Sequence, residues 1–152
     1  MPRRAFSLLE IMIVVVIMGI LAAVAIPRFA GAADEARAAA TESVLASVRA
    51  SIAAYRAGAV IAGEDPFPTL AELTDGSVLR DPPPANPFTG VRGVQAVTRN
   101  QAEARTVVNK TAAGWNYFAD NASEPPVAIF YANCDDDTTR TDSGGAVPAN
   151  EL

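Results

Sequence analysis

The chain has no histidine and only one cysteine, Cys134, among its 152 residues. Without histidine it lacks the commonest general base of enzymes and a common zinc ligand. A single cysteine cannot form an internal disulfide bond. A glycine-rich phosphate-binding loop is missing as well. These absences leave no catalytic constellation, so we predict that the protein is not an enzyme.

Basic residues are also scarce. The chain has 12 lysine and arginine residues against 17 aspartate and glutamate residues, for a formal net charge of -5. An acidic chain of this kind is not suited by its charge to DNA or to anionic lipid surfaces. We therefore expect no nucleic-acid partner. A length of 152 residues suits one domain with a modest core.

The chain does have one long apolar run near its start. Residues 11–26 carry no charge, and Pro27 follows them. As a helix, residues 6–26 would span about 30 Å, which is the thickness of a bilayer core. Arg3 and Arg4 precede the run and favour a cytoplasmic start. The sequence thus predicts a membrane helix with the remaining chain across the membrane.

One acidic residue, Glu10, interrupts this apolar segment near its start. A carboxylate in hydrocarbon costs roughly 2.5–3.5 kcal/mol even on lenient insertion scales. Cleavage between Ala5 and Phe6 would create an amino terminus to pair with it, because residues four apart share one helix face. The alternative is that Glu10 extends to the lipid headgroups.

Two other interpretations of the N-terminus stay open. The segment could be a removable secretory signal that is cleaved after the small residues 23–25. Arg3 and Arg4 could instead belong to a twin-arginine signal. Glu10 breaks the apolar region early for the first interpretation, and the run is unusually hydrophobic for the second.

Residues 5–27 resemble the N-terminus of type IV pilins and type II secretion pseudopilins. The shared features are a short basic leader and four residues at fixed places, namely Phe6, Glu10, Gly19 and Pro27. The resemblance implies a prepilin peptidase that removes residues 1–5 and methylates the amine of Phe6. The family usually has glycine before the cut, and this chain has Ala5. In the resembled filaments the glutamate pairs with the terminal amine of a neighbouring subunit.

Gly19 and Pro27 weaken a helix. Proline removes a backbone donor and clashes with the carbonyl of Ala23, at a cost of about 3 kcal/mol or more. Glycine costs about 1 kcal/mol relative to alanine. The resemblance implies that the stretch between them melts or extends when the subunit enters a filament. A static kink is the alternative.

The expected fold class is α+β and pilin-like. A long N-terminal helix has a protruding hydrophobic first half, residues 6–27, and an amphipathic second half, residues 28–57, which packs on a small antiparallel sheet. One apolar stripe marks the second half: Val44, Leu45, Val48, Ile52 and Tyr55. Gly58 is the expected helix terminator.

Residues 58–93 are predicted to connect this helix to the sheet. Thr69 and Glu72 fit a capping box for a short helix that ends near Gly76. Four prolines between positions 82 and 87 exclude helix and central strand, so residues 80–90 should form an extended loop. This loop resembles the one between helix and sheet in pseudopilins.

Residues 94–132 are predicted to form the antiparallel sheet. The best strand candidates are residues 114–119 and 127–132, which are rich in aromatic and β-branched residues. Residues 93–98 and 105–109 are weaker candidates. Trp115 and Tyr117 lie on one face and are expected in the core.

Residues 133–152 are predicted to be an acidic C-terminal loop. Asp135, Asp137 and Asp142 are our candidates for oxygen ligands of a Ca²⁺ ion, since clustered aspartates beside glycines can bind this ion. Some pseudopilins hold calcium in this region. A solvated acidic loop is the alternative, and Cys134 is expected to behave as a small hydrophobic residue.

We therefore expect a structural subunit of a helical type IV pilus-like filament. The resemblance implies that an inner-membrane precursor is cleaved by the peptidase and polymerised on an assembly platform into an extracellular or periplasmic filament. A major pseudopilin of a type II secretion system is the alternative within the family, favoured by the proline-rich loop and the missing disulfide. A tryptophan-containing strand favours a pilus. Outside the family, the rivals are a Sec-exported soluble binding domain and a secreted enzyme with an acidic metal centre.

Overall fold

A computed structural model of the chain describes residues 7–152, apart from the side chain of Ala30. The elements in chain order are α1 (Leu8–Ala62), α2 (Leu70–Thr74), β1 (Val94–Ala96), α3 (Arg99–Glu103), β2 (Trp115–Asp120), β3 (Val127–Ala132), β4 (Asp137–Asp142), β5 (Gly145–Pro148) and the 3-10 helix η1 (Ala149–Glu151). The chain divides into two compact units between Glu35 and Ala36. Each unit is considered separately below. The predicted leader, residues 1–5, and Phe6 lie outside the described residues.

Helix α1 ends five residues later than expected, at Ala62 and not at residue 57. Gly58 lies inside the helix, and the residue that stops it is Gly63, with a φ of 75°. The backbone N–H of Glu64 donates to the carbonyl of Ala59 at 2.9 Å, the bond that closes a Schellman motif. The prediction of Gly58 as terminator was wrong because the helix continues past Gly58 and buries Ala59, and Gly63 supplies the left-handed conformation that ends it.

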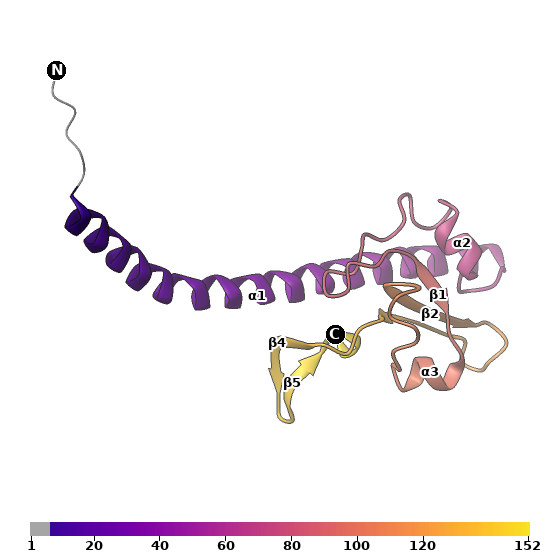
Figure 1. Cartoon of the computed structure of the whole chain (residues 1–152). Coiled ribbons are helices and arrows are strands. Elements are labelled where there is room, and N and C mark those ends of the chain that lie inside the picture. Colours follow the sequence, from indigo (N-terminus) through magenta and orange to yellow (C-terminus); the bar gives the residue numbers. More distant parts are fainter. Residues whose placement is uncertain (1–6) are drawn as a thin grey trace, which may run out of the picture. The chain divides into compact units, whose positions relative to one another are not determined.

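The α+β class is confirmed, but the sheet is mixed rather than purely antiparallel. Its strand order is β1-β2-β3, and Figure 1 shows β1 and β2 alongside the second half of α1. Strand β2 runs antiparallel to β3 and parallel to β1. A parallel pair needs a crossover of a dozen or more residues, and α3 lies within the crossover between β1 and β2.

The weaker strand candidate, residues 105–109, is not a strand. Arg105 and Asn109 have φ values of 47° and 44°, in the left-handed region that a strand cannot contain. Helix α3 just before them was not predicted. It is capped by Thr98, whose hydroxyl accepts from the N–H of Gln101 while the Gln101 side chain accepts from the N–H of Thr98.

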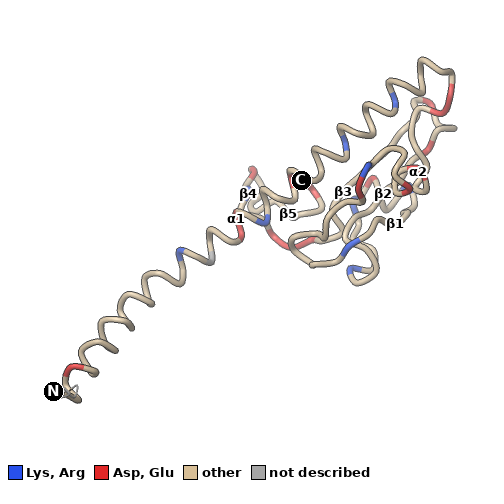
Figure 2. The backbone as a smooth tube through the Cα atoms, turned by 90° about the horizontal axis from the view of Figure 1, so that it is seen from above, with Lys and Arg blue, Asp and Glu red and all other residues tan. Residues whose placement is uncertain are grey.

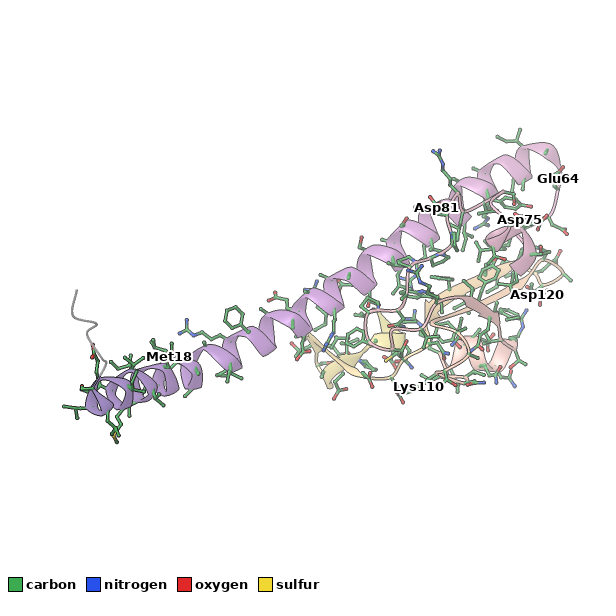
Figure 3. The ribbon with its side chains drawn as sticks, turned by 45° about the horizontal axis from the view of Figure 1, so that its top comes forward. Met18, Glu64, Asp75, Asp81, Lys110 and Asp120 are labelled. Carbon is green, nitrogen blue, oxygen red and sulfur yellow. The ribbon has the colours of Figure 1, made fainter. Side chains whose placement is uncertain are left out.

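Inside the unit after Glu35, the apolar stripe of α1 packs against the sheet. Leu45, Val48 and Ile52 belong to one buried cluster with Trp115, Tyr117 and Phe130. The Trp115 and Phe130 rings stack with centroids 5.7 Å apart. Figure 3 shows the side chains that fill the space between this part of α1 and the strands. The predicted stripe and the predicted core positions of Trp115 and Tyr117 are thus confirmed.

The connecting region is fastened to the sheet by side-chain hydrogen bonds. Helix α2 has the predicted capping box between Thr69 and Glu72. The proline-rich loop contains neither helix nor strand, as predicted, but residues 87–89 form a turn and are not extended. Its Pro84 carbonyl accepts from Trp115 Nε1 at 2.8 Å. Buried Asn86 donates from Nδ2 to the carbonyl of Gly114 at 2.9 Å. A Cβ on Gly114 would overlap the carbonyl oxygen of Val91 and come within 2.9 Å of Asn86 Cβ.

A network of buried amide side chains anchors the segment between α3 and β2. Asn116 and Asn133 are both fully buried. Asn133 Oδ1 accepts from Asn116 Nδ2 at 3.0 Å and from the backbone N–H of Val108 at 2.8 Å. Asn133 Nδ2 donates to the carbonyl of Ala113 at 2.7 Å. Because these groups satisfy one another, the irregular backbone is held without regular secondary structure.

The prediction of a loop at residues 133–152 was wrong, because most of these residues form regular structure. Strands β4 and β5 form an antiparallel hairpin, and η1 follows it. The hairpin turns at Ser143 and Gly144, and Gly145, the first residue of β5, has a φ of 125°. Arg140 on β4 donates from Nε and Nη2 to the two carboxylate oxygens of Glu42 on α1, at 2.6 Å and 2.7 Å. This fork ties the hairpin to the helix.

Candidate functional site

The first part of α1 presents apolar side chains without a partner in its own unit. Fifteen large apolar residues between Leu8 and Phe29 are each at least 44% exposed. The most apolar 18-residue window has a mean hydropathy of 2.9, and none of it is buried among the described residues. A core helix of a soluble protein of this length would be mostly buried. By length and composition, α1 can cross a membrane.

Charge is nearly absent from this part of the helix. Figure 2 shows one acidic position in the first turn of α1 and then an uncharged stretch until Arg28. The acidic position is Glu10, which is exposed. Its predicted partner, the amine that cleavage would create on Phe6, lies outside the described residues, as does Ala5. The pairing itself therefore stays a prediction.

Glu10 also has a local role that the sequence pattern Ser-x-x-Glu could have indicated. Ser7 precedes the helix, and its Oγ accepts from the backbone N–H of Glu10 at 3.2 Å. This places Glu10 at the third helical position, where a carboxylate interacts favourably with the helix dipole. The same side chain can thus stabilise the helix start in a lone subunit and remain available to a second partner.

Gly19 and Pro27 both lie within α1, which continues through them without a break. A side chain at Gly19 would meet no atom within 4 Å. Because Pro27 has no N–H, the carbonyl of Ala23 receives no helical hydrogen bond from it. Helix α1 is therefore continuous through Gly19 and Pro27 but has one fewer backbone hydrogen bond at Pro27.

The three aspartates proposed for calcium do not meet in the described structure. No three His, Cys, Asp or Glu side chains among residues 7–152 lie close enough together to hold a metal ion. Asp135 pairs with Lys110, which keeps the pKa of this carboxyl below its ordinary value. Asp142 Oδ1 accepts from the N–H of Gly144 in the hairpin turn at 2.7 Å. Calcium binding stays a prediction that this arrangement does not favour.

The single cysteine is not a reactive group. Cys134 is fully buried next to β3. Burial raises the pKa of its thiol to about 11, so the nucleophilic thiolate is rare at neutral pH. The expectation of a small hydrophobic residue is confirmed.

Comparison with known proteins identifies the class of the apolar segment. Residues 1–26 match the family model described as the prokaryotic N-terminal methylation motif. The chain therefore begins with a prepilin-type segment. Together with the exposed apolar helix, this motif fits a membrane-anchored precursor.

A curated relative extends the similarity beyond the motif. Over 53 residues the chain is 43% identical to the type IV narrow pilus major component PilA5 of Thermus thermophilus. The alignment covers 35% of this chain and 46% of the relative, so less than half of the relative's length is matched. No solved structure gave a significant match. The similarity of the chain to type IV pilins thus rests on the motif at residues 1–26 and on this partial alignment.

Proposed function

We propose that the protein is a structural subunit of a type IV pilus-like filament that assembles through the apolar part of α1. The observation that carries this proposal is the exposure of fifteen large apolar side chains in a segment of prepilin type. Each buried methylene gains about 0.8 kcal/mol, so covering these side chains is strongly favourable. A bundle of identical helices would provide that cover.

The precursor would reside in the inner membrane before assembly. Residues 8–26 are long and apolar enough to span the hydrocarbon. A prepilin peptidase would cut between Ala5 and Phe6 and methylate the new amine. An assembly platform would then transfer the subunit to an extracellular or periplasmic filament. The protein's role is mechanical and not catalytic.

Glu10 would set the register of the filament. Inside a bundle of apolar helices, an unpaired carboxylate or ammonium group is costly. A subunit that places Glu10 beside the Phe6 amine of its neighbour neutralises both charges, and other registers leave both unpaired. The pair therefore selects one arrangement more than it adds net stability. The stretch from Gly19 to Pro27 would extend during assembly, because its helical bonds are the weakest.

A type II secretion pseudopilus is the second candidate. The proline-rich loop and the single cysteine support it. The name of the curated relative, a pilus major component, supports a pilus. Filaments of the two kinds differ in where they are found, so their location distinguishes the candidates.

The decisive experiment is mass spectrometry of the N-terminal peptide of protein extracted from its native cells. The expected peptide begins with N-methylated Phe6. A protein that begins at Ile26 would instead be an exported soluble domain, and the filament proposal would be wrong. Electron microscopy of cells with and without the gene then tests for filaments and shows whether they are extracellular.

A further inference from the structure

The unit after Glu35 contains a pocket of about 390 Å³ that the proposed assembly does not use. It lies between α1, Phe67, Arg105 and strand β3. Its lining residues are Arg49, Ile52, Ala53, Arg56, Phe67, Arg105, Ala128, Ile129 and Phe130. This volume lies within the range of about 300–1,000 Å³ that is usual for small-molecule sites.

Three arginines and no acidic residue line this pocket, although the whole chain is acidic. None of Arg49, Arg56 and Arg105 forms an ion pair with an aspartate or glutamate side chain among the described residues. The side-chain ion pairs of residues 7–152 are made by other arginines and by Lys110. Arg49 and Arg105 share the terminal carboxylate of Leu152, so three guanidinium groups face one negative charge. The pocket keeps a positive charge that attracts an anion.

Arg49 is already held by hydrogen bonds to the backbone. Arg49 donates from Nη2 to the carbonyl of Phe130 at 3.2 Å and to the backbone oxygen of Leu152 at 3.0 Å. Burial and the nearby charge of Arg105 lower the pKa of Arg49. Arg49 thus contributes a positive charge to one side of the pocket but has a structural role, so it is not chosen for substitution.

The other two arginines retain donors for a ligand. The Arg56 guanidinium lies over the Phe67 ring, 5.0 Å from its centroid, and makes no hydrogen bond with a described residue. Arg105 Nη1 makes only long contacts, at 3.4 Å to the carbonyl of Asn150 and at 3.5 Å to the backbone oxygen of Leu152. A planar guanidinium with free donors matches a carboxylate in a bidentate arrangement.

The remaining walls are apolar. Ile52 comes from α1, Phe67 from the segment before α2, and Ile129 and Phe130 from β3. Such walls favour a ligand with an apolar body. They also favour a singly charged carboxylate over a doubly charged phosphate, whose desolvation costs more.

We propose that this pocket binds a carboxylate carried on an apolar body, held by Arg56 and Arg105 with the body against Phe67 and Ile129. The carboxylate could come from a free organic acid or from an acidic side chain of a neighbouring subunit. This site is separate from the N-terminal assembly segment, so binding of a free acid does not depend on the proposed filament, whereas a carboxylate from a neighbouring subunit rests on it.

The test uses the full chain, labelled with ¹⁵N and held in detergent micelles. 3-Phenylpropionate is the probe, and the uncharged 3-phenylpropanamide is its control. We expect saturable chemical-shift changes at the amides of residues 128–130 and of Phe67 with the acid only. Arg56→Gln should weaken binding about tenfold, since one charge-assisted hydrogen-bonding group is lost.

Two controls make the test decisive. Arg80 is exposed on the loop outside the pocket, so Arg80→Gln removes the same charge and should leave affinity within about twofold. Unchanged spectra of Arg56→Gln without ligand confirm that it is folded, and Arg105→Gln provides a second variant. No saturable change, equal binding of the amide or of inorganic phosphate, or full affinity in both variants would overturn the proposal.

A second arm identifies the source of the carboxylate once binding is measured. Cells that carry Arg56→Gln are compared with cells that carry Arg80→Gln. Fewer filaments with Arg56→Gln alone would assign the carboxylate to a neighbouring subunit. Normal filaments with both variants would assign it to a free acid.

Discussion

The two parts of helix α1 follow different rules. From Leu8 to Phe29 the large apolar side chains are exposed on every side of the helix. Between Val44 and Ile52 the large apolar residues lie on one stripe, and Leu45, Val48 and Ile52 are at most 7% exposed. A helix that is apolar on one stripe finds its partner within its own chain, whereas a helix that is apolar all round needs a membrane or other copies. The predictions below change one part and ask whether the other responds.

The largest effect is expected for Glu10→Ala. We predict that the precursor still inserts in the membrane and that filament yield falls more than a hundredfold, because an unpaired terminal amine in an apolar bundle costs roughly 3–5 kcal/mol. Sheared filaments and membrane fractions are quantified by immunoblot. Glu35→Ala, on the same helix, is the matched control. Normal filament yield with Glu10→Ala would refute the pairing.

Replacing the buried Trp115 should destabilise the unit after Glu35 and leave the exposed first part of α1 unaffected. Trp115→Ala removes the largest fully buried side chain and should lower the free energy of unfolding by about 3–5 kcal/mol. Calorimetry in micelles measures the change. Ile17→Ala, at an exposed position, should leave the same transition unchanged. Trp115→Phe keeps an aromatic ring in the core but loses the bond to Pro84 and some volume, and we expect it to cost less than Trp115→Ala.

Substitution of two glycines by alanine should change the free energy of unfolding in opposite directions. Gly114→Ala places a methyl group against the backbone of Val91 and against Asn86, and we expect a loss of about 1–3 kcal/mol. Gly58→Ala meets no atom within 4 Å inside α1, and we expect a gain of about 0.5–1 kcal/mol. The fluorescence of the single tryptophan during urea unfolding reports both changes. A destabilised Gly58→Ala variant would mean that this end of α1 has a further contact.

The smallest effect is expected at the fork between Glu42 and Arg140. Their side chains are 37% and 55% exposed, so water screens the pair, and Glu42→Gln should cost less than about 1 kcal/mol. Hydrogen exchange of the β4 and β5 amides should accelerate while that of β2 stays constant. Equal acceleration in β2 would show that the hairpin is not an independent element.

The same fork predicts a dependence on pH. Hydrogen bonds from Arg140 to the Glu42 carboxylate hold the pKa of Glu42 below its ordinary value of 4.5. The pair therefore stabilises the hairpin above pH 4.5, and the stabilisation is lost as the pH falls through the lowered folded-state pKa. Added salt should reduce the effect. Glu42→Gln should remove the pH dependence of hairpin exchange in this window.

Local patterns predicted much of the fold. The stripe from Val44 to Ile52, the capping box of α2 and strands β2 and β3 all follow from residues close together in the chain. The parallel pairing of β1 was missed because it depends on the crossover through α3, although the Thr98 and Gln101 spacing was a visible sign of that helix. The hairpin of β4 and β5 was missed because the aspartates around it were interpreted as ligands, while the Ser143-Gly144 turn was the stronger signal.

The candidate site was predicted in part. Glu10 stands out because it is the only charge in the apolar segment, and its cost in hydrocarbon can be estimated from the residue type alone. Its bond with Ser7 was recognisable from spacing but was not identified. The arginine pocket could not be predicted, because Arg49 and Arg56 are brought to Arg105 only by the packing of α1 on β3.

The buried amide network around Asn116 and Asn133 has one more consequence. Its members are neutral and carry no ionisable group, so protons and salt in the surroundings have no charge there to act upon. The irregular backbone that they hold should keep its geometry under the acidic or high-salt conditions that weaken the pair of Glu42 and Arg140. This amide network is thus insensitive to conditions that weaken the ion pair at the surface.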